Sequence, residues 1–523
     1  MQQPNFLVFI TDQQRADHLG CYGNSVIRTP HIDSLATRGT LFERCYVASP
    51  SCMPNRSAIM TGRMPGAAGA RMNGVPLPLD SHTVVDVLRD AGWRTALIGK
   101  SHLQNMTDNA PTWLQAGSVP REQARGDVRD DARYEQESCA RWRTDSHAVN
   151  TPYYGFDHVE LCLEHGDQVS GDYERWLRRQ RPGTDTLVGP ANALPGAASP
   201  APQAWRTAVP EELYPSAFVK ERTISWLEEQ AESPGQPFFL QCSFPDPHHP
   251  FTPPGKYWSM YDPDDVVLPD SCTSATANDI PLKRALHDEL ARGTRSTKGS
   301  RVIAVTPEEA RAAIALNYGA ISMIDDMIGA ILARLDALNL AQNTIVLFLS
   351  DHGDFMGDHG LLFKGPLHYQ SLVRMPFIWA DPNDPTGRVN GQLASAIDIA
   401  PTILARAGLT APHGVQGLNL APTEDAAGRH ESRTAVLIEE EGHRPMPGSG
   451  LPKVRTVVTD QWRLSIHAYD NWGELYNLRS DPGERNNLWH DPAYIEIRAS
   501  LLWQLASTMA RHADDCPLPT RMA

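Results

Sequence analysis

The sequence predicts an α/β fold, with a mixed, mostly parallel central sheet flanked by helices and a smaller C-terminal antiparallel sheet. Two short apolar runs, residues 5–11 and 344–350, have the composition of strands buried on both faces, and each is followed by an aspartate. Helical and strand-like segments alternate between them, whereas short β-rich runs separated by turn signals dominate the last hundred residues. Because open α/β sheets bind ligands at the carboxyl ends of their strands, we expect a site at that edge.

The other elements follow from local patterns. Residues 83–91 and 307–338 are predicted to be helices, and Glu308 and Glu309 fall in the first turn of the second one. Two further strands are predicted at residues 95–98 and 238–244. The C-terminal sheet is expected to use the runs 435–438, 454–458 and 462–467, followed by a helix at 492–509.

These elements divide into a main domain, residues 1–425, and a C-terminal α+β subdomain, residues 426–523. Two segments interrupt the main domain: about 182–212 is rich in Pro, Ala and Gly, and about 262–305 is polar with Lys and Arg clusters. Both are predicted to be long surface insertions, acting as lids or as oligomer contacts. We therefore expect a homo-oligomer, either a dimer or a tetramer.

The composition limits which binding partners and which cellular compartment we expect. The 523 residues are 41% hydrophobic and 21% charged, without an apolar run long enough for a membrane span. The net charge of −15 argues against nucleic acid as the main partner, and an anionic substrate would need a local basic cluster. The start of the chain lacks the pattern of a signal peptide, so we expect a cytoplasmic protein whose eight scattered cysteines are reduced.

Cys52 lies in the most informative segment, where Pro54 and Arg56 follow it at alternate positions. Proline suits the first turn of a helix, so Cys52 is expected at a helix N-terminus, where unbonded N–H groups favour an anion. Arg56 comes one turn later on the same face and can hold Cys52 or an anion there. The alternative interpretation is a buried structural cysteine.

The residues after the two apolar runs are candidate metal ligands. Asp12 follows the first run, and Asp351 and His352 follow the second. Carboxylates suit Ca²⁺, Mg²⁺ or Mn²⁺ better than a soft metal. For Asp12 alone, a cap or turn role is the competing interpretation.

The Cys-x-Pro-x-Arg core at residues 52–56, with Thr-Gly-Arg at 61–63, resembles the signature of the type I sulfatases of the alkaline phosphatase superfamily. Segments in the family's order extend the resemblance: Asp12-Gln13, Gly99-Lys100-Ser101-His102, Pro247-His248-His249-Pro250, Asp351-His352 and Lys364-Gly365. It runs from Asn5 to the segment at 474–482, and the chain also looks close to the phosphonate monoester hydrolase branch. The resemblance implies an alkaline-phosphatase-like fold, in which residues 1–425 form the catalytic domain.

The resemblance also implies the site residues. Cys52 would be oxidised to formylglycine, and its hydrated gem-diol would be the nucleophile. One divalent cation, Ca²⁺ in preference to Mn²⁺ or Mg²⁺, would be held by Asp12, Cys52, Asp351 and His352. Many sulfatases have a second aspartate where this chain has Gln13, whose amide oxygen could still coordinate. The remaining matched residues would act on the nucleophile and the substrate: Arg56, Lys100, His102, His248 and Lys364 as catalytic groups, and Asn73, Lys100, His248 and Lys364 in substrate binding.

Three of these assignments have alternatives. His248 is the expected acid that protonates the leaving alcohol, and His249 is the second choice. Asn73 precedes Gly74, so a plain turn is an alternative to substrate contact. Either lysine, taken by itself, could be a solvated surface charge.

The predicted activity is hydrolysis of a small-molecule sulfate monoester, arylsulfatase-like, releasing sulfate and an alcohol or phenol. A formylglycine-generating enzyme would be a transient partner, and neither nucleic acid nor a membrane is expected. The main alternative is a phosphonate monoester or phosphodiester hydrolase with the same nucleophile. Two others are a non-catalytic binding protein that keeps Cys52 as a thiol, and a cysteine hydrolase with a Cys–His pair.

Overall fold

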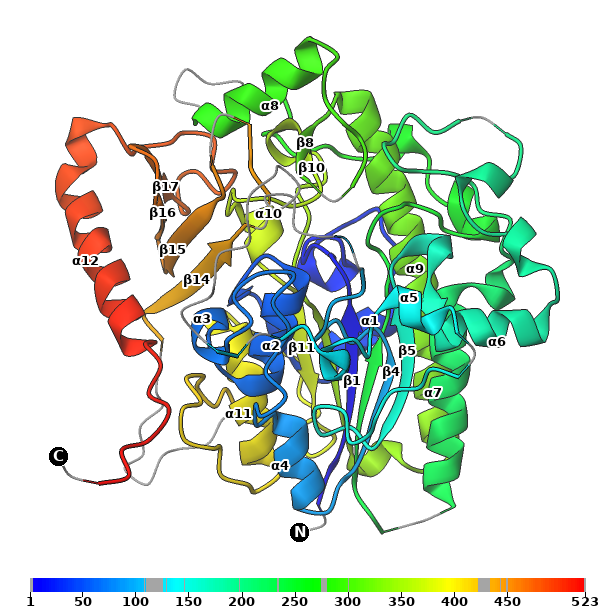
Figure 1. The fold of residues 1–523 in the computed structure, drawn as a ribbon. Coiled ribbons are helices and arrows are strands. Elements are labelled where there is room, and N and C mark those ends of the chain that lie inside the picture. Colours follow the sequence, from blue (N-terminus) through cyan, green and yellow to red (C-terminus); the bar gives the residue numbers. More distant parts are fainter. Residues whose placement is uncertain are drawn as a thin grey trace.

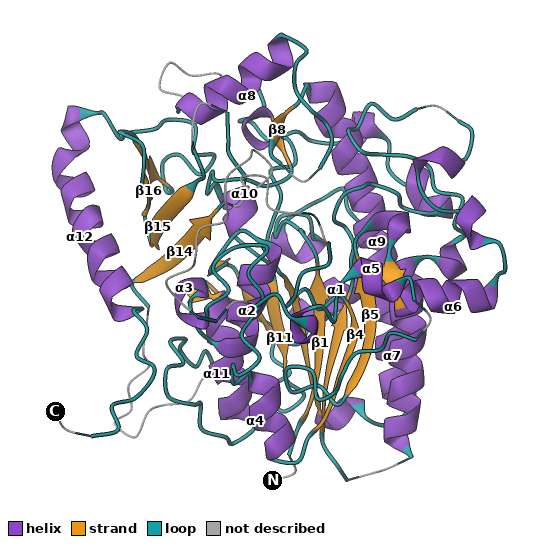
Figure 2. Ribbon diagram, viewed as in Figure 1, coloured by secondary structure: helices purple, strands orange, loops and turns teal. Residues whose placement is uncertain are grey.

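The computed structural model describes residues 3–521 apart from 108, 110–125, 128, 145, 197, 233–234, 274–279, 300, 422–432, 443 and 448–449. A nine-stranded sheet runs through its centre in the order β12-β2-β11-β9-β1-β7-β4-β5-β6 (Figures 1 and 2). The strands are β1 (Asn5–Thr11), β2 (Thr40–Phe42), β4 (Arg94–Gly99), β5 (His158–Leu163), β6 (Ser170–Gly171), β7 (Phe238–Ser243), β9 (Thr344–Ser350), β11 (Phe377–Ala380) and β12 (Arg388–Asn390). The five strands β9, β1, β7, β4 and β5 are parallel to one another, while β11 runs against β9. The predicted mixed, mostly parallel sheet is confirmed.

Strand β1 is buried on both faces, as its apolar run predicts. Phe6, Val8 and Ile10 belong to one hydrophobic core, and Leu7 and Phe9 belong to the other. This alternation follows from the two-residue period of a strand. The sheet therefore separates two cores.

Helices cover both faces. The first core includes α2 (Cys52–Thr61), α4 (Val84–Asp90) and α11 (Ile399–Arg406). The second includes α1 (Pro30–Thr37), α6 (Asp172–Gln180), α7 (Pro215–Ala231) and α9 (Pro307–Ala337). Shorter helices are α3 (Pro65–Ala68), α5 (Cys139–Trp142) and α10 (Gln370–Val373). A three-layer arrangement of helices, sheet and helices results (Figure 2).

The longest helix, α9, begins where its sequence signals place the start. Thr306 and Glu309 form a capping box, and Pro307 occupies the first turn. Of the part of the chain that is described, α9 is the one helix long and apolar enough to cross a membrane, and 89% of its apolar window is buried inside the protein. It packs against α7 and α1, so it serves as a core helix.

The C-terminal sheet has four antiparallel strands: β14 (Ala435–Glu441), β15 (Lys453–Thr459), β16 (Trp462–His467) and β17 (Gly473–Asn477). Helix α12 (Ile495–Arg511) packs on β14 and β15. The predicted small antiparallel sheet with a C-terminal helix is thus confirmed. The proposed domain boundary at 425/426 lies outside the described residues and stays a prediction.

The two predicted insertions are anchored in the body of the protein where they are described. Asp167 accepts hydrogen bonds from Trp205 and Thr207, which hold the first segment down. The second segment contains α8 (Pro281–Ala291), whose Leu282 and Leu286 are buried in the first core. Two-stranded sheets complete the fold: β8 (Ile303–Ala304) with β10 (Leu361–Leu362), and β3 (Cys45–Tyr46) with β13 (Ala394–Ser395).

Candidate active site

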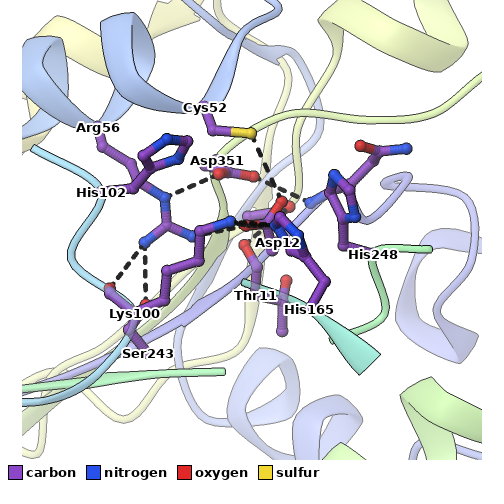
Figure 3. Close-up of polar contacts among 12 residues, drawn as sticks. Thr11, Asp12, Cys52, Arg56, Lys100, His102, His165, Ser243, His248 and Asp351 are labelled. Atoms are coloured by element: carbon purple, nitrogen blue, oxygen red, sulfur yellow. Dashed lines mark hydrogen bonds and ion pairs between the residues drawn. The ribbon is translucent and has the colours of Figure 1, made fainter. Parts of the chain in front are cut away.

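Five parallel strands deliver polar side chains to one edge of the sheet. The residues just beyond the strands are Asp12 after β1, Asp351 and His352 after β9, Lys100 after β4, His248 after β7 and His165 after β5. Backbone hydrogen bonds continue past the ends of the strands: the N–H of Asp351 donates to Thr11 O at 3.1 Å, and that of Lys100 to Ser243 O at 2.9 Å. This ladder fixes the side chains where the carboxyl ends of the strands converge (Figure 3).

Cys52 is the first residue of helix α2, as the position of Pro54 predicts. The preceding Ser51 is extended and makes no side-chain cap, so the first N–H groups of the helix need other partners. Asn73 supplies one, since its Oδ1 accepts from Met53 N at 3.2 Å. Asn55 ties the same turn to β9, because its Nδ2 donates to Asp351 O at 2.5 Å.

The Cys52 sulfur lies among charged groups. Its Sγ is 2.9 Å from Lys364 Nζ, 3.1 Å from His352 Nε2 and 3.8 Å from Asp12 Oδ1. Burial and the Asp12 carboxylate oppose ionisation of the thiol, but Lys364 and His352 outweigh them and lower the pKa of Cys52. A functional interpretation is favoured over a structural cysteine, because a merely packed cysteine would have apolar neighbours.

The residues present fit a hard divalent cation. Asp12, Cys52, Asp351 and His352 each offer a ligand atom, and these four atoms lie within 4.8 Å of one another. Gln13 adds to this set: its amide Nε2 donates to Asp354 Oδ2 at 2.5 Å, while its buried Oε1 has no hydrogen-bond partner among the described residues. Two carboxylates, an imidazole and an orphaned amide oxygen suit Ca²⁺, Mg²⁺ or Mn²⁺.

Arg56 holds the two carboxylates in place. It is 2% exposed; its Nε donates to Asp351 Oδ2 at 2.8 Å, and its Nη2 lies 3.5 Å from Asp12 Oδ2. Its Nη1 reaches across to β4 and β7, donating to Lys100 O at 3.0 Å and to Ser243 Oγ at 2.9 Å. Arg56 is therefore a positioning residue that links four strand ends to α2.

Lys100 lies beneath Asp12 and is fully buried. Its Nζ contacts Asp12 Oδ2 and lies 2.5 Å from His165 Nε2. Burial opposes ionisation of Asp12, but Lys100, His165, His248 and Arg56 hold the pKa of this carboxyl well below its usual range. Asp12 is thus an anion at neutral pH.

His165 is a site residue that the sequence motifs did not identify. Its ring stacks on His248 with centroids 3.6 Å apart and an interplanar angle of 14°. The available signal was its place two residues after β5, but residues 158–163 mix polar and apolar side chains and lack the apolar run that predicts a buried strand. His165 connects Lys100 to His248.

His248 faces Lys364, with 3.3 Å between His248 Nε2 and Lys364 Nζ. Its Nδ1 contacts the carbonyl oxygen of His249, which favours the proton on Nδ1 and leaves Nε2 pointing into the site. Burial, the two neighbouring imidazoles and Lys364 lower the pKa of His248 well below its usual value. His249 packs on Phe363 at 4.0 Å between ring centroids, and its Nδ1 lies 3.3 Å from Gln13 Nε2, which fits the role of a structural neighbour.

His102 is held by its backbone. Its N–H donates to Glu137 Oε2 at 2.8 Å, its φ is +56°, and its Nδ1 has no hydrogen-bond partner in the part of the chain that the structure describes. Burial, Lys100 and Arg56 keep the pKa of His102 well below its usual value, so the ring is neutral and next to the cationic pair (Figure 3). A neutral imidazole with an unused nitrogen can accept a proton.

The structure gathers the predicted residues into one cluster. Asp12, Cys52, Arg56, Lys100, His248, Asp351, His352 and Lys364 are joined through the contacts above, with His102 beside them and Asn73 at the start of α2. Their catalytic roles stay predictions. The geometry offers a buried nucleophile position, a cation site, three basic side chains and two imidazoles.

Comparisons with known proteins agree with this geometry. The Sulfatase family profile matches residues 4–409, and the profile "N-sulphoglucosamine sulphohydrolase, C-terminal" matches residues 357–511. An arylsulfatase of Clostridium perfringens is 29% identical, with 94% of this chain and 92% of the relative covered. A multifunctional alkaline phosphatase superfamily protein of Trinickia caryophylli is 27% identical, with 98% and 96% covered.

Solved structures agree in fold. The phosphonate monoester hydrolase of Agrobacterium radiobacter superposes with a TM-score of 0.77 at 24% identity, covering 99% of this chain and 98% of that one. The match of the Sulfatase profile to residues 4–409 spans well over half of the 523 residues. The chain therefore belongs to the sulfatase family, within the alkaline phosphatase superfamily, and is a sulfuric ester hydrolase.

Proposed function

We propose that this enzyme hydrolyses sulfate monoesters, arylsulfatase-like, using a formylglycine made from Cys52 as the nucleophile and one divalent cation. The observation that carries the proposal is the position of Cys52 at the start of α2, within 3.8 Å of Asp12, His352 and Lys364. A reacting group there meets helix N–H groups, a lysine and the candidate ligands at once.

The cation would be held by Asp12, Asp351, His352 and the converted Cys52, with Gln13 Oε1 as a further oxygen ligand. When bound, it supplies Lewis-acid activation of the nucleophile and neutralises charge on the transferring group. Arg56 keeps both carboxylates aligned, since it contacts Asp12 and Asp351 together. We favour Ca²⁺, with Mn²⁺ and Mg²⁺ as alternatives, because the donor set is mostly oxygen.

Local charge explains how a protein with a net charge of −15 would attract an anionic substrate. Arg56, Lys100 and Lys364 bring three positive charges to the cluster against the two carboxylates Asp12 and Asp351. Converting the thiol, whose pKa is lowered by Lys364 and His352, into an aldehyde replaces an ionisable group by one without an acidic proton. The pocket is then cationic, which suits a tetrahedral oxyanion.

His248 would protonate the leaving oxygen through Nε2, which lies beside Lys364 Nζ. Its low pKa in the substrate-free site means that it must gain a proton when the substrate arrives, and an anionic sulfate ester next to it favours that charged form. His102, neutral and with an unused Nδ1, would take a proton from the nucleophile's second hydroxyl. The two imidazoles would thus act as acid and base.

The alternative is a phosphonate monoester or phosphodiester hydrolase with the same nucleophile. The TM-score of 0.77 to a phosphonate monoester hydrolase and the Asp12-Gln13 pair favour that branch. The Lys100 and His102 pair favours the sulfatase assignment. Turnover of a nitrophenyl sulfate compared with a phenylphosphonate monoester, on the same preparation, decides between them.

The nucleophile is tested with Cys52→Ser and an aryl sulfate. A serine can attack once but has no second hydroxyl to release sulfate, so multiple turnover should be lost while the protein stays folded. Cys21→Ser, at a partly exposed cysteine outside the site, is the control and should keep wild-type turnover. Wild-type multiple turnover by Cys52→Ser would refute the proposal.

The state of residue 52 is checked by mass spectrometry of its peptide. Conversion replaces SH and H by a carbonyl oxygen and lowers the mass accordingly. The conversion requires a formylglycine-generating enzyme as a transient partner, so the wild-type protein should be active only from cells that contain one. An active preparation in which residue 52 is entirely cysteine would favour a thiol mechanism instead.

A further inference from the structure

Helix α12 lies at the periphery of the molecule, on the outer side of the C-terminal sheet (Figure 1). Its inner face packs on β14 and β15 through Leu501, Leu505 and Thr508, which are at most 5% exposed. The opposite face points away from the protein. In a helix of this kind the outer face is normally polar.

The outer face of α12 is apolar instead. Its large side chains are strongly exposed: Trp503 at 76%, Ile495 at 51%, Met509 at 38% and Leu502 at 36%. Ala499 and Ala506 lie between them and are also exposed. A contiguous exposed apolar strip of this kind marks an interaction site.

The spacing of the strip is that of a coiled coil. Ile495, Ala499, Leu502, Ala506 and Met509 are separated by four, three, four and three residues, which is the a/d pattern of a heptad repeat. Of the a and d positions of this heptad, one is always alanine and the other is always a large apolar side chain. The large side chains of the strip can therefore act as knobs, and its alanine positions as shallow holes, for a second copy of the same strip.

We propose that this strip, residues 495, 499, 502, 503, 506 and 509 of α12, is the interface of a two-fold symmetric homodimer in which two α12 helices pack antiparallel. A two-fold interface uses the same patch on both subunits, so it must be self-complementary. Alternating Ala and large residues meet this requirement, because the large side chains of one helix enter the positions left by the alanines of the other.

The alternation of alanines and large side chains also fixes the orientation. In a parallel pair like positions of the heptad face each other, so large side chains would meet large ones. An antiparallel pair instead sets each large side chain against an alanine of the partner. The strip has no basic residue, and the net charge of −15 disfavours an anionic membrane as the occupant.

The dimer is expected to be concentration-dependent. A helix of 17 residues is roughly 25 Å long, so one helix pair provides a contact below the about 800 Å² per partner of a standard interface. Burying Trp503 and the three large aliphatic side chains supplies most of the affinity. The candidate active site is built from other elements, so the proposal does not depend on the proposed function.

Sedimentation equilibrium of the full chain, over micromolar concentrations, tests the proposal. The wild type should show a species of twice 57.7 kDa. Leu502→Glu and, separately, Ala506→Glu should weaken dimerisation at least a hundredfold and leave the thermal midpoint and turnover unchanged. Ser500→Glu adds the same charge at an exposed polar position of α12 and should dimerise like the wild type.

A monomeric wild type, or a dimer that survives Leu502→Glu and Ala506→Glu, overturns the proposal. So does a monomer that binds phosphatidylcholine vesicles through this strip, which would assign the face to a lipid surface.

Discussion

At the scale of single residues, the site is a set of charges that hold one another in place. Arg56 and Lys100 share the Asp12 carboxylate, and Lys364 lies between Cys52 and His248. Such groups could be buried only together, because an isolated charge in this position would be too costly to desolvate. Each single replacement therefore affects its neighbours.

His165 should matter although it contacts neither Cys52 nor the candidate ligands other than Asp12. His165→Ala removes the ring that stacks on His248 and the nitrogen beside Lys100. We expect turnover to fall roughly 10- to 100-fold, as for other residues that orient a catalytic group. Steady-state kinetics with an aryl sulfate measures this, and rescue by His165→Gln, which keeps a polar contact to Lys100, separates positioning from bulk packing.

The matched control is His158→Ala. His158 is at the start of the same strand, β5, and pairs with Glu160 at a partly exposed position. Its replacement should leave turnover unchanged. Equal losses in the two variants would mean that β5 is merely destabilised and that His165 has no specific role.

If a divalent cation binds at this site, the free energy of unfolding should depend on the metal. In metal-stripped protein, a bound divalent ion should raise the free energy of unfolding by about 2.7 kcal/mol at a hundredfold excess over its Kd. Thermal shifts with Ca²⁺, Mn²⁺ and Mg²⁺ measure the response, which Asp351→Asn should abolish. Asp326→Asn, at an exposed carboxylate of the separate His31, Asp325 and Asp326 group, should keep it. A shift that persists in Asp351→Asn would place the ion elsewhere.

At the scale of elements, the parallel strands position the side chains of the site. Gly99 ends β4 with φ at +106°, and a Cβ there would lie 1.8 Å from Ser243 O on β7. Only glycine allows the two strands to approach this closely just before Lys100. The close approach brings Lys100 beneath Asp12.

Gly99→Ala should therefore separate β4 from β7. We expect about 1–3 kcal/mol of backbone strain and about 1–3 kcal/mol more from overpacking, with a large loss of turnover. Gly92→Ala is the matched control, since its φ is +101° but no described residue lies within 4 Å of the added Cβ. Urea unfolding and turnover compare the two, and similar losses in both would refute the steric explanation.

At the scale of the whole molecule, a buried ionic network organises the C-terminal sheet. Arg463 on β16 is fully buried, donates to Glu474 at 3.0 Å and contacts Glu484. Glu484 also accepts from the N–H of Gln370 at 2.7 Å, at the start of α10 in the main sheet's domain. The network thus joins the C-terminal sheet to the segment that follows Lys364.

Removing the arginine should destabilise the whole chain. Arg463→Met leaves two buried carboxylates without their cation, a change that costs about 3–5 kcal/mol. Arg479→Ala breaks an exposed pair with Asp460 and should leave the free energy of unfolding nearly unchanged. Chemical denaturation of both variants tests this, and comparable stabilities would show that the network contributes little.

The sequence by itself determined much of the fold and the chemistry. Asn5–Thr11 and Thr344–Ser350 are strands with the predicted bounds, and Cys52 begins a helix as Pro54 indicated. These results depend on local rules, namely apolar runs, turn residues and proline at a helix start, which a single segment contains. The motif residues also carried the family resemblance.

Only the tertiary structure decided which side chains meet. His165 joined the site because β5 pairs beside β4 in the sheet, and Arg56 contacts carboxylates that follow two different strands. The apolar side of α12 likewise became visible only when its other side was seen to pack on the C-terminal sheet. Strand order and the choice of buried face depend on long-range packing, which no local stretch of sequence encodes.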